Sequence, residues 1–152
     1  MKKILICFLL LSVISCKQDD EDCNDRLTCI APEVNLQFQS KKTGEDLFAN
    51  GTYLPEEVTA VDLESGNVYQ NLFYFTDSDG NFIFTIGDGV GNFNRSLNVI
   101  IRDEIDFNLD YRLMALGISG CCPGFRYDNL NITNVEFVPG TDSNSNSFII
   151  RL

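Results

Sequence analysis

Apolar and polar residues alternate with a period of two from residue 33 to the C-terminus, and turn residues interrupt the alternation. This pattern predicts β-strands with one buried face, and no stretch is typical of an amphipathic helix. The strands are expected within residues 34–39, 59–63, 68–76, 82–86, 97–101, 107–115, 132–138 and 148–152. The run 68–76 is apolar on both faces around Phe73, which favours a central strand. We therefore expect an all-β chain, an antiparallel sandwich of about eight strands over residues 32–152.

One hairpin is marked by the turn Asp77-Ser78-Asp79-Gly80, because Asp-Gly between alternating apolar runs is a strong hairpin signal. The stretch from Thr76 to Phe84, TDSDGNFIF, resembles a hairpin of the carboxypeptidase-regulatory-like, or transthyretin-like, sandwiches. The resemblance covers nine residues, and nothing after residue 90 matches. It implies an immunoglobulin-like or transthyretin-like β-sandwich that serves as a scaffold or adhesion module.

The first 16 residues, MKKILICFLLLSVISC, combine two lysines, an apolar stretch and a terminal cysteine. The apolar stretch is about eleven residues long, too short to span a hydrocarbon layer of roughly 30 Å, and has signal-peptide length. Its end, Val13-Ile14-Ser15-Cys16, resembles the lipobox of bacterial lipoproteins. That resemblance implies a signal peptide over residues 1–15 and a mature chain anchored by acyl chains on Cys16. An ordinary secretory signal peptide is the alternative.

Residues 16–31 are predicted to form an acidic tether. Asp19, Asp20, Glu21 and Asp22 repel one another, which favours an extended, solvated linker. The sequence Lys17-Gln18 followed by these acids resembles the export signal of surface lipoproteins in some Gram-negative bacteria. The resemblance implies an outer-membrane location and display on the outer face.

The cysteines point to disulfides in an exported chain. Once Cys7 leaves with the signal peptide and Cys16 is acylated, four remain, at Cys23, Cys29, Cys121 and Cys122. A bond between the two neighbouring cysteines would strain the backbone, so either pairing of the first two with the last two is expected. A four-thiolate zinc site is the rival, and the adjacent pair fits its usual ligand spacing poorly.

The residue types that are missing narrow the chemistry. The chain has no histidine, which removes the Ser-His and Cys-His mechanisms and His-ligated metals. Its formal charge of −11 becomes more negative when Lys2 and Lys3 leave with the signal peptide, so nucleic acid is not an expected partner. We predict a protein without cofactor that is not an enzyme.

The predicted hairpin also carries a possible metal site. Asp77, Asp79, Asn81 and Asp88 match part of the ligand spacing of a calcium loop. Glycine stands at the fourth position of that loop rather than the sixth, and this favours a hairpin turn. A weak calcium site remains the alternative.

Two further patches are candidates. Phe125, Arg126 and Tyr127 follow the cysteine pair in a predicted loop and form a candidate recognition patch. Asp103, Glu104 and Asp106 form a dense acidic cluster between two predicted strands, which solvation of a turn also explains.

The sequence thus predicts a lipid-anchored surface lipoprotein whose β-sandwich is a binding or accessory module for a protein or glycan. Two alternatives stay open: a structural envelope lipoprotein without ligand, and a carboxylate-dependent glycan hydrolase using the acidic cluster.

Overall fold

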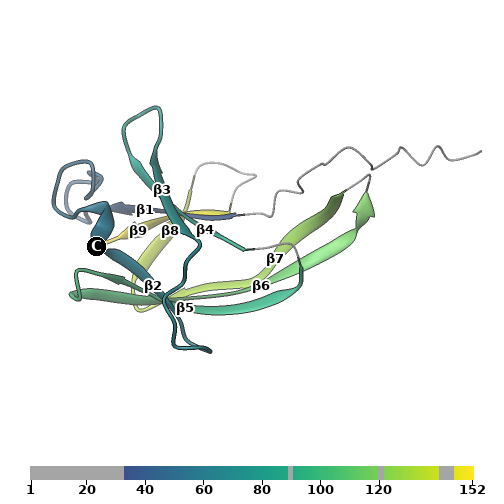
Figure 1. The fold of residues 1–152 in the computed structure, drawn as a ribbon. Coiled ribbons are helices and arrows are strands. Elements are labelled where there is room, and N and C mark those ends of the chain that lie inside the picture. The colour runs from purple at the N-terminus through teal and green to yellow at the C-terminus, as the bar shows by residue number, and fades with distance from the viewer. Residues whose placement is uncertain (1–32, 89–90, 120–121, 141–145) are drawn as a thin grey trace, which may run out of the picture.

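The structure, a computed structural model, describes residues 33–88, 91–119, 122–140 and 146–152, without the side chains of 117–119, 122 and 123. Two β-sheets are stacked in a sandwich (Figure 1). In chain order the elements are β1 (Glu33–Gln39), the 3-10 turn η1 (Pro55–Glu57), β2 (Val58–Asp62), β3 (Leu72–Thr76), β4 (Phe82–Gly87), β5 (Phe93–Ile101), β6 (Ile105–Ser119), β7 (Cys122–Thr133), β8 (Glu136–Pro139) and β9 (Asn146–Arg151). No helix in these ranges is long and apolar enough to cross a membrane.

The topology confirms the expected all-β sandwich and adds one parallel pair. The first sheet has the strand order β3-β4-β1-β9-β8, and the second has β2-β5-β6-β7. Every pair is antiparallel except β1 and β9, which run parallel. The structure has nine strands in its described part, compared with about eight expected.

Alternation along the strands builds the core. In β1, Val34, Leu36 and Phe38 are fully buried, while Asn35 and Gln37 lie on the outer face. The same inward rows come from β4, β5 and β6, so both sheets turn apolar residues toward each other. Phe38 of the first sheet contacts Phe107 of the second, with ring centroids 6.1 Å apart. The predicted inward rows of these strands are confirmed.

Two aspartates fix the β3–β4 hairpin. Asp77 Oδ1 accepts hydrogen bonds from the backbone N–H groups of Asp79 and Asn81, both at 2.9 Å, and this confirms the predicted turn. Asp46, 6 % exposed, accepts backbone N–H groups from Phe48 at 2.9 Å and from Phe82 at 3.1 Å. The Asp46 carboxylate therefore ties the loop after β1 to the start of β4.

The expected central strand at 68–76 is wrong. β3 covers only Leu72–Thr76 and is the edge of its sheet. Its aromatic side chains Phe73, Tyr74 and Phe75 are 59 %, 48 % and 51 % exposed. An unbroken apolar run is typical of strands covered on both faces, but here no described element covers the outer side of β3.

Two other boundaries also differ from expectation. The predicted loop around the cysteine pair is mostly strand, because β6 continues to Ser119 and β7 begins at Cys122. The expected strand 132–138 is divided by a turn at Asn134, whose φ of 71° ends β7 and separates it from β8. In β2 the buried residues are Val58 and Ala60, so the inward row is shifted by one residue from the alternating Thr59, Val61 and Leu63 that the sequence predicts for this strand.

β6 and β7 form an arm that extends past the other strands. β5 pairs with β6 only as far as Leu113, and the residues of β6 beyond it pair with β7 alone. Figure 1 shows this two-stranded arm projecting from one end of the sandwich. The predicted recognition patch, Phe125 to Tyr127, lies on β7 of this arm, where its backbone pairs with β6.

Candidate functional site

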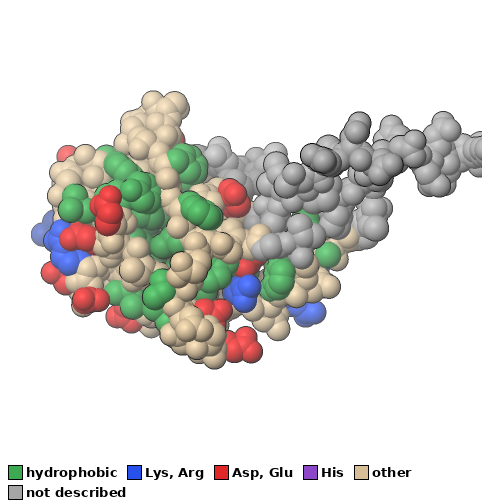
Figure 2. Space-filling view, in the orientation of Figure 1, with side chains coloured by type: hydrophobic (Ala, Val, Ile, Leu, Met, Phe, Trp, Pro, Cys, Tyr) green, Lys and Arg blue, Asp and Glu red, His purple; other side chains and the backbone are tan. Residues whose placement is uncertain are grey.

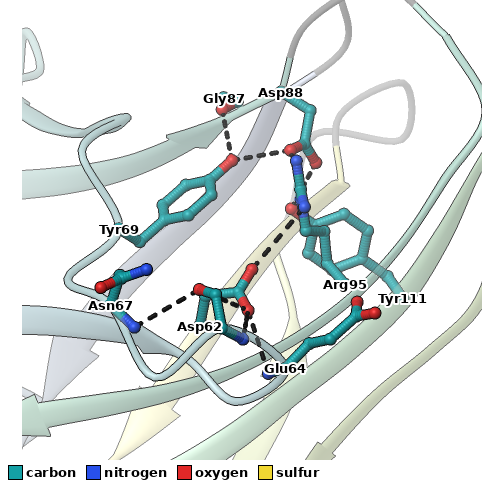
Figure 3. Close-up of polar contacts among 9 residues, drawn as sticks. Asp62, Glu64, Asn67, Tyr69, Gly87, Asp88, Arg95 and Tyr111 are labelled. Carbon is teal, nitrogen blue, oxygen red and sulfur yellow. Dashed lines mark hydrogen bonds and ion pairs between the residues drawn. The ribbon is translucent and has the colours of Figure 1, made fainter.

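A group of polar side chains joins the two sheets at the end of the sandwich where β4 ends. Asp88 follows β4, Arg95 belongs to β5, Tyr111 belongs to β6, and Tyr69 lies in the segment that links β2 to β3 (Figure 3). We call these four residues the Asp88 cluster. Alternation aims Arg95 and Tyr111 inward, because they stand in the same rows as Leu97 and Leu109.

Both oxygens of the Asp88 carboxylate accept hydrogen bonds in this cluster. Oδ1 accepts from the Tyr69 hydroxyl at 2.7 Å and from Arg95 Nε at 2.9 Å. Oδ2 accepts from the Tyr111 hydroxyl at 2.6 Å. The Asp88 side chain is 0 % exposed, so these donors replace the water that a carboxylate otherwise requires.

Arg95 also reaches a second carboxylate. Its Nη1 lies 3.6 Å from Asp62 Oδ2 at the end of β2, and its guanidinium stands over the rings of Tyr69 and Phe93. Asp62 Oδ1 in turn accepts the backbone N–H of Ser65 at 2.8 Å (Figure 3 shows the turn). Arg95 thus links Asp88, which follows β4, to Asp62 at the end of β2.

The ionisation of the tyrosines follows from this burial. Burial, and then the hydrogen bond to Asp88, raises the pKa of Tyr69 to about 12. The same two causes, in the same order, raise the pKa of Tyr111 further. Burial foremost also raises the pKa of Tyr127, whose ring packs edge-on against Tyr111 at 5.2 Å between centroids. All three phenols stay protonated near neutral pH, and those of Tyr69 and Tyr111 act as hydrogen-bond donors to Asp88.

The cluster is suited to holding the sheets together rather than to moving protons. A general base needs a pKa near the working pH, and these phenols lie far above it. The hydrogen bond to Asp88 foremost raises the pKa of Arg95, which therefore stays charged. Across the described residues, no buried side-chain nitrogen or oxygen lacks a hydrogen-bond partner. We interpret the Asp88 cluster as a structural polar contact that holds the two sheets together, and refer to these four residues as the latch.

The residues of the possible calcium loop are divided between two places. Asp77 and Asn81 lie together at the β3–β4 turn, where Asn81 Nδ2 donates to Asp77 Oδ2 at 3.1 Å. Asp88 lies beyond the far end of β4, six extended residues or roughly 20 Å away, in the latch. No group of three His, Cys, Asp or Glu side chains suited to a metal occurs within the described ranges. The structure does not bring Asp88 to the other three residues.

The predicted recognition patch lies on β7 rather than in a loop. Arg126 is exposed and pairs with Asp128, with Nη2 and Oδ1 3.6 Å apart. Phe125 and Tyr127 are half-buried on the opposite side of the strand, and Tyr127 packs against the Asp88 cluster. The three side chains therefore do not share one surface.

The remaining predicted residues fall on exposed turns or outside the described chain. Asp103 and Glu104 are exposed in the β5–β6 turn, and Asp106 is exposed at the start of β6. Cys16, Cys23, Cys29 and Cys121 lie outside the described residues, as does the side chain of Cys122. Lipidation and disulfide pairing remain predictions.

Sequence reasoning missed the latch, although one signal was present. Arg95 occupies an inward position of β5, in the row Phe93, Leu97, Val99 and Ile101. A guanidinium on a core-facing row requires a buried acceptor. Asp88, in the glycine-rich segment shortly before Arg95, is the nearest preceding acid that could be this acceptor.

A second feature is an exposed aromatic surface. Phe73 and Phe75 form the β3 surface, and Figure 2 shows apolar side chains gathered on the face over β3. Phe73 and Phe75 stand on the outer face of the sheet beside Thr85 and Ile83. Tyr74 points to the other face, where its hydroxyl donates to Glu56 Oε1 at 3.3 Å. Adjacent exposed aromatics of this size are typical of interaction sites.

Comparisons of the chain with protein-family models, with curated proteins and with solved structures found no match. The class that the fold defines is a β-sandwich of two sheets.

Proposed function

We propose that the protein is a lipid-anchored outer-membrane lipoprotein, displayed at the cell surface, whose β-sandwich is a non-enzymatic binding or accessory module. The anchor is Cys16, the tether is residues 16–31, and the partner is a protein or a glycan. No cofactor takes part.

The anchor is supported by the sequence. The basic start, the short apolar stretch and Val13-Ile14-Ser15-Cys16 match a lipoprotein signal peptide. Lys17-Gln18 and the acids after them support the outer-face location. A sandwich held in this way presents its surfaces to whatever lies next to the cell.

The binding role is carried by one observation, the exposure of the β3 surface. Phe73 and Phe75, 59 % and 51 % exposed on the same face of the sheet, leave apolar area in water, and a partner that covers them would remove that cost. The one carboxylate in the latch is fully engaged by its donors, so it is not available for catalysis. Both points favour binding over chemistry.

Lipidation is tested by mass spectrometry of the mature N-terminus and by labelling with a palmitate analogue. The wild type and Cys7→Ser should both start at diacylglyceryl-modified Cys16, whereas Cys16→Ser should carry no lipid. Cys7→Ser is the matched control because it changes a cysteine of the same leader. Label that persists in Cys16→Ser would refute the anchor.

Surface display is tested by adding protease to intact cells. The wild type should be digested, and replacing Asp19, Asp20 and Glu21 by alanine should protect it. If both the wild type and the alanine variant resist the protease, the wild type is not displayed on the outer face of the cell, and surface display is refuted.

Binding is tested by cross-linking in intact cells followed by recovery of the chain from solubilised envelope. A partner should be recovered with the wild type and lost with Phe73→Ser combined with Phe75→Ser. Leu116→Ser is the control, since Leu116 is 44 % exposed on the β6–β7 arm, away from β3. Recovery unchanged by the β3 substitutions would refute this surface as the binding site.

The hydrolase alternative has its own test. Activity on a polysaccharide panel that disappears with Asp103→Asn or Glu104→Gln would establish it in place of the binding module.

A further inference from the structure

The hydrogen bonds at both ends of the β3–β4 ladder show which backbone groups of β3 face β4 and which face the free edge. Gly87 N–H donates to Asn71 C=O at 3.1 Å, and Asp77 N–H donates to Asn81 C=O at 3.0 Å. These contacts bracket the β3–β4 ladder, in which Phe73 pairs with Thr85 and Phe75 with Ile83. In an antiparallel ladder, hydrogen-bonded and non-bonded pairs alternate. The backbone groups of Phe73 and Phe75 therefore point to β4.

The intervening residues of β3 point their backbone the other way. Leu72, Tyr74 and Thr76 direct their N–H and C=O groups to the open edge. Within the described part of the chain, no other backbone or side-chain group is hydrogen-bonded to these atoms. The edge thus offers three donors and three acceptors in the geometry of a β-ladder.

The other sheet edges are protected. Residues 67–69 cover the edge of β2, since Tyr69 N–H donates to Ala60 C=O at 2.8 Å. β8 is only four residues long and ends in Pro139, and the β6–β7 ladder has two register shifts. β7 is the remaining edge strand, and the register shifts in its ladder with β6 make that edge irregular. Short strands, proline and bulges discourage edge pairing. β3 has no proline, lysine or arginine, and its ladder with β4 has no shift.

The charges near this edge select the partner. Glu56 receives the Tyr74 hydroxyl, and Asp77 and Asp79 follow the end of β3. None of these three acids forms an ion pair with a lysine or arginine of the described residues. A second copy of this chain would bring a second Glu56 to the interface, and it is itself acidic, with a formal charge of −11 over the full sequence. A basic segment would instead neutralise these acids.

We propose that β3 binds an extended protein segment as an additional strand, and that this segment has apolar residues at alternate positions flanked by lysine or arginine. Ladder hydrogen bonds to Leu72, Tyr74 and Thr76 hold the segment. Its apolar side chains pack beside Phe73 and Phe75. This inference rests on the proposed binding function and specifies its partner and mode.

The probe is a panel of capped, fluorescent seven-residue peptides with lysine at both ends and alternating apolar residues and threonine between them. The apolar residue is Val, Leu, Phe or Tyr in each peptide. The protein is the full mature chain, and binding is followed by fluorescence anisotropy. We expect at least one peptide to bind, and a peptide with both lysines replaced by glutamate to bind several-fold more weakly at low salt.

A matched pair of variants tests the mode. Thr76→Pro removes one edge N–H without touching the β4 ladder, and Thr76→Val keeps the N–H and the side-chain shape. We expect Thr76→Pro to weaken binding at least tenfold and Thr76→Val to change it less than twofold. Circular dichroism and the unfolding midpoint verify that both variants fold. Because Thr76→Pro still carries Phe73 and Phe75, it separates ladder pairing from simple apolar contact.

Nuclear magnetic resonance identifies the atoms. The amide protons of Leu72, Tyr74 and Thr76 should gain protection from hydrogen exchange on peptide binding, whereas those of Phe73 and Phe75 are protected beforehand. Failure of the whole panel to bind, or equal binding to Thr76→Pro, overturns the inference. Concentration-dependent protection of the edge amides without peptide would show that a second copy is the occupant, and this also overturns it.

The proposed function is separable from this result. If the envelope partner is lost with the Phe73 and Phe75 substitutions but retained with Thr76→Pro, the binding module stands and the added strand does not.

Discussion

Removing the charge of Asp88 should test whether the latch holds the sheets together. Asp88→Asn keeps the shape of the side chain but removes the negative charge that faces Arg95 Nε at 2.9 Å. It also places an amide N–H₂ against one of the donors, Tyr69 or Tyr111, so that one hydroxyl must turn away. The side chain is 0 % exposed, so water does not replace the lost acceptor.

The magnitude follows from the contacts. Breaking a buried ion pair by removing one partner costs about 3–5 kcal/mol. Arg95 keeps its contact with Asp62 and its side chain is 28 % exposed, which moves the expectation to the lower end. We expect Asp88→Asn to reduce the free energy of unfolding by about 3 kcal/mol. That is a large share of the roughly 5–15 kcal/mol typical of a domain.

The assay is urea unfolding followed by circular dichroism, arranged as a double-mutant cycle. Arg95→Met alone leaves Asp88 buried without its cation, and the double variant removes both charges. The double variant should lose less than the sum of the two single losses by at least about 1 kcal/mol. Asp128→Asn, which breaks an exposed pair with Arg126, is the control and should change stability by less than about 1 kcal/mol. A loss below about 1 kcal/mol for Asp88→Asn, with additive singles, would refute the latch.

Three further predictions address other parts of the chain. Because the pKa of Tyr69 is raised from about 10 to about 12, the folded state holds its proton more tightly than the unfolded state. The contribution of Tyr69 to the free energy of unfolding should therefore be full below about pH 10 and be lost between about pH 10 and 12. Urea midpoints and tyrosinate absorbance measured across that range check this, and a Tyr69 that ionises near pH 10 with no fall in the midpoint would contradict it. Asp46→Ala should lower stability by about 2–3 kcal/mol in thermal unfolding, since it removes the acceptor for Phe48 and Phe82, and a loss as small as a surface change would contradict that role. Peptide mapping without reductant should join the two cysteines of the tether to the pair at 121 and 122, and free thiols at all four positions would exclude the disulfides.

The fold was largely predictable because most strands bury one face. In β1, β4, β5 and the first part of β6, the inward residues are the apolar ones of each alternating row, as in Leu36 and Phe84. β3 was misplaced because its composition suits a central strand. Whether a strand is central or at an edge depends on which distant strands pair with it, and a local pattern does not contain that information.

The latch was less predictable for a similar reason. Tyr69, Asp88, Arg95 and Tyr111 come from four segments, and the registers of two sheets bring them together. Of these, only Arg95 carried a visible local conflict, a charge in an apolar row. The free edge of β3 depends on two things. The Asp-Gly turn predicts the β3–β4 register, but it does not predict that no described strand pairs with the other side of β3.

The parallel contact between β1 and β9 has a consequence for how the protein is made. Val34 of β1 lies opposite Asn146 of β9, so the centre of this sheet stays incomplete until residues 146–151 have been synthesised. Contacts so distant along the chain form slowly, because a long loop must close before they stabilise anything. A ribosome-bound intermediate that has not yet reached residues 146–151 therefore lacks the strand between β1 and β8.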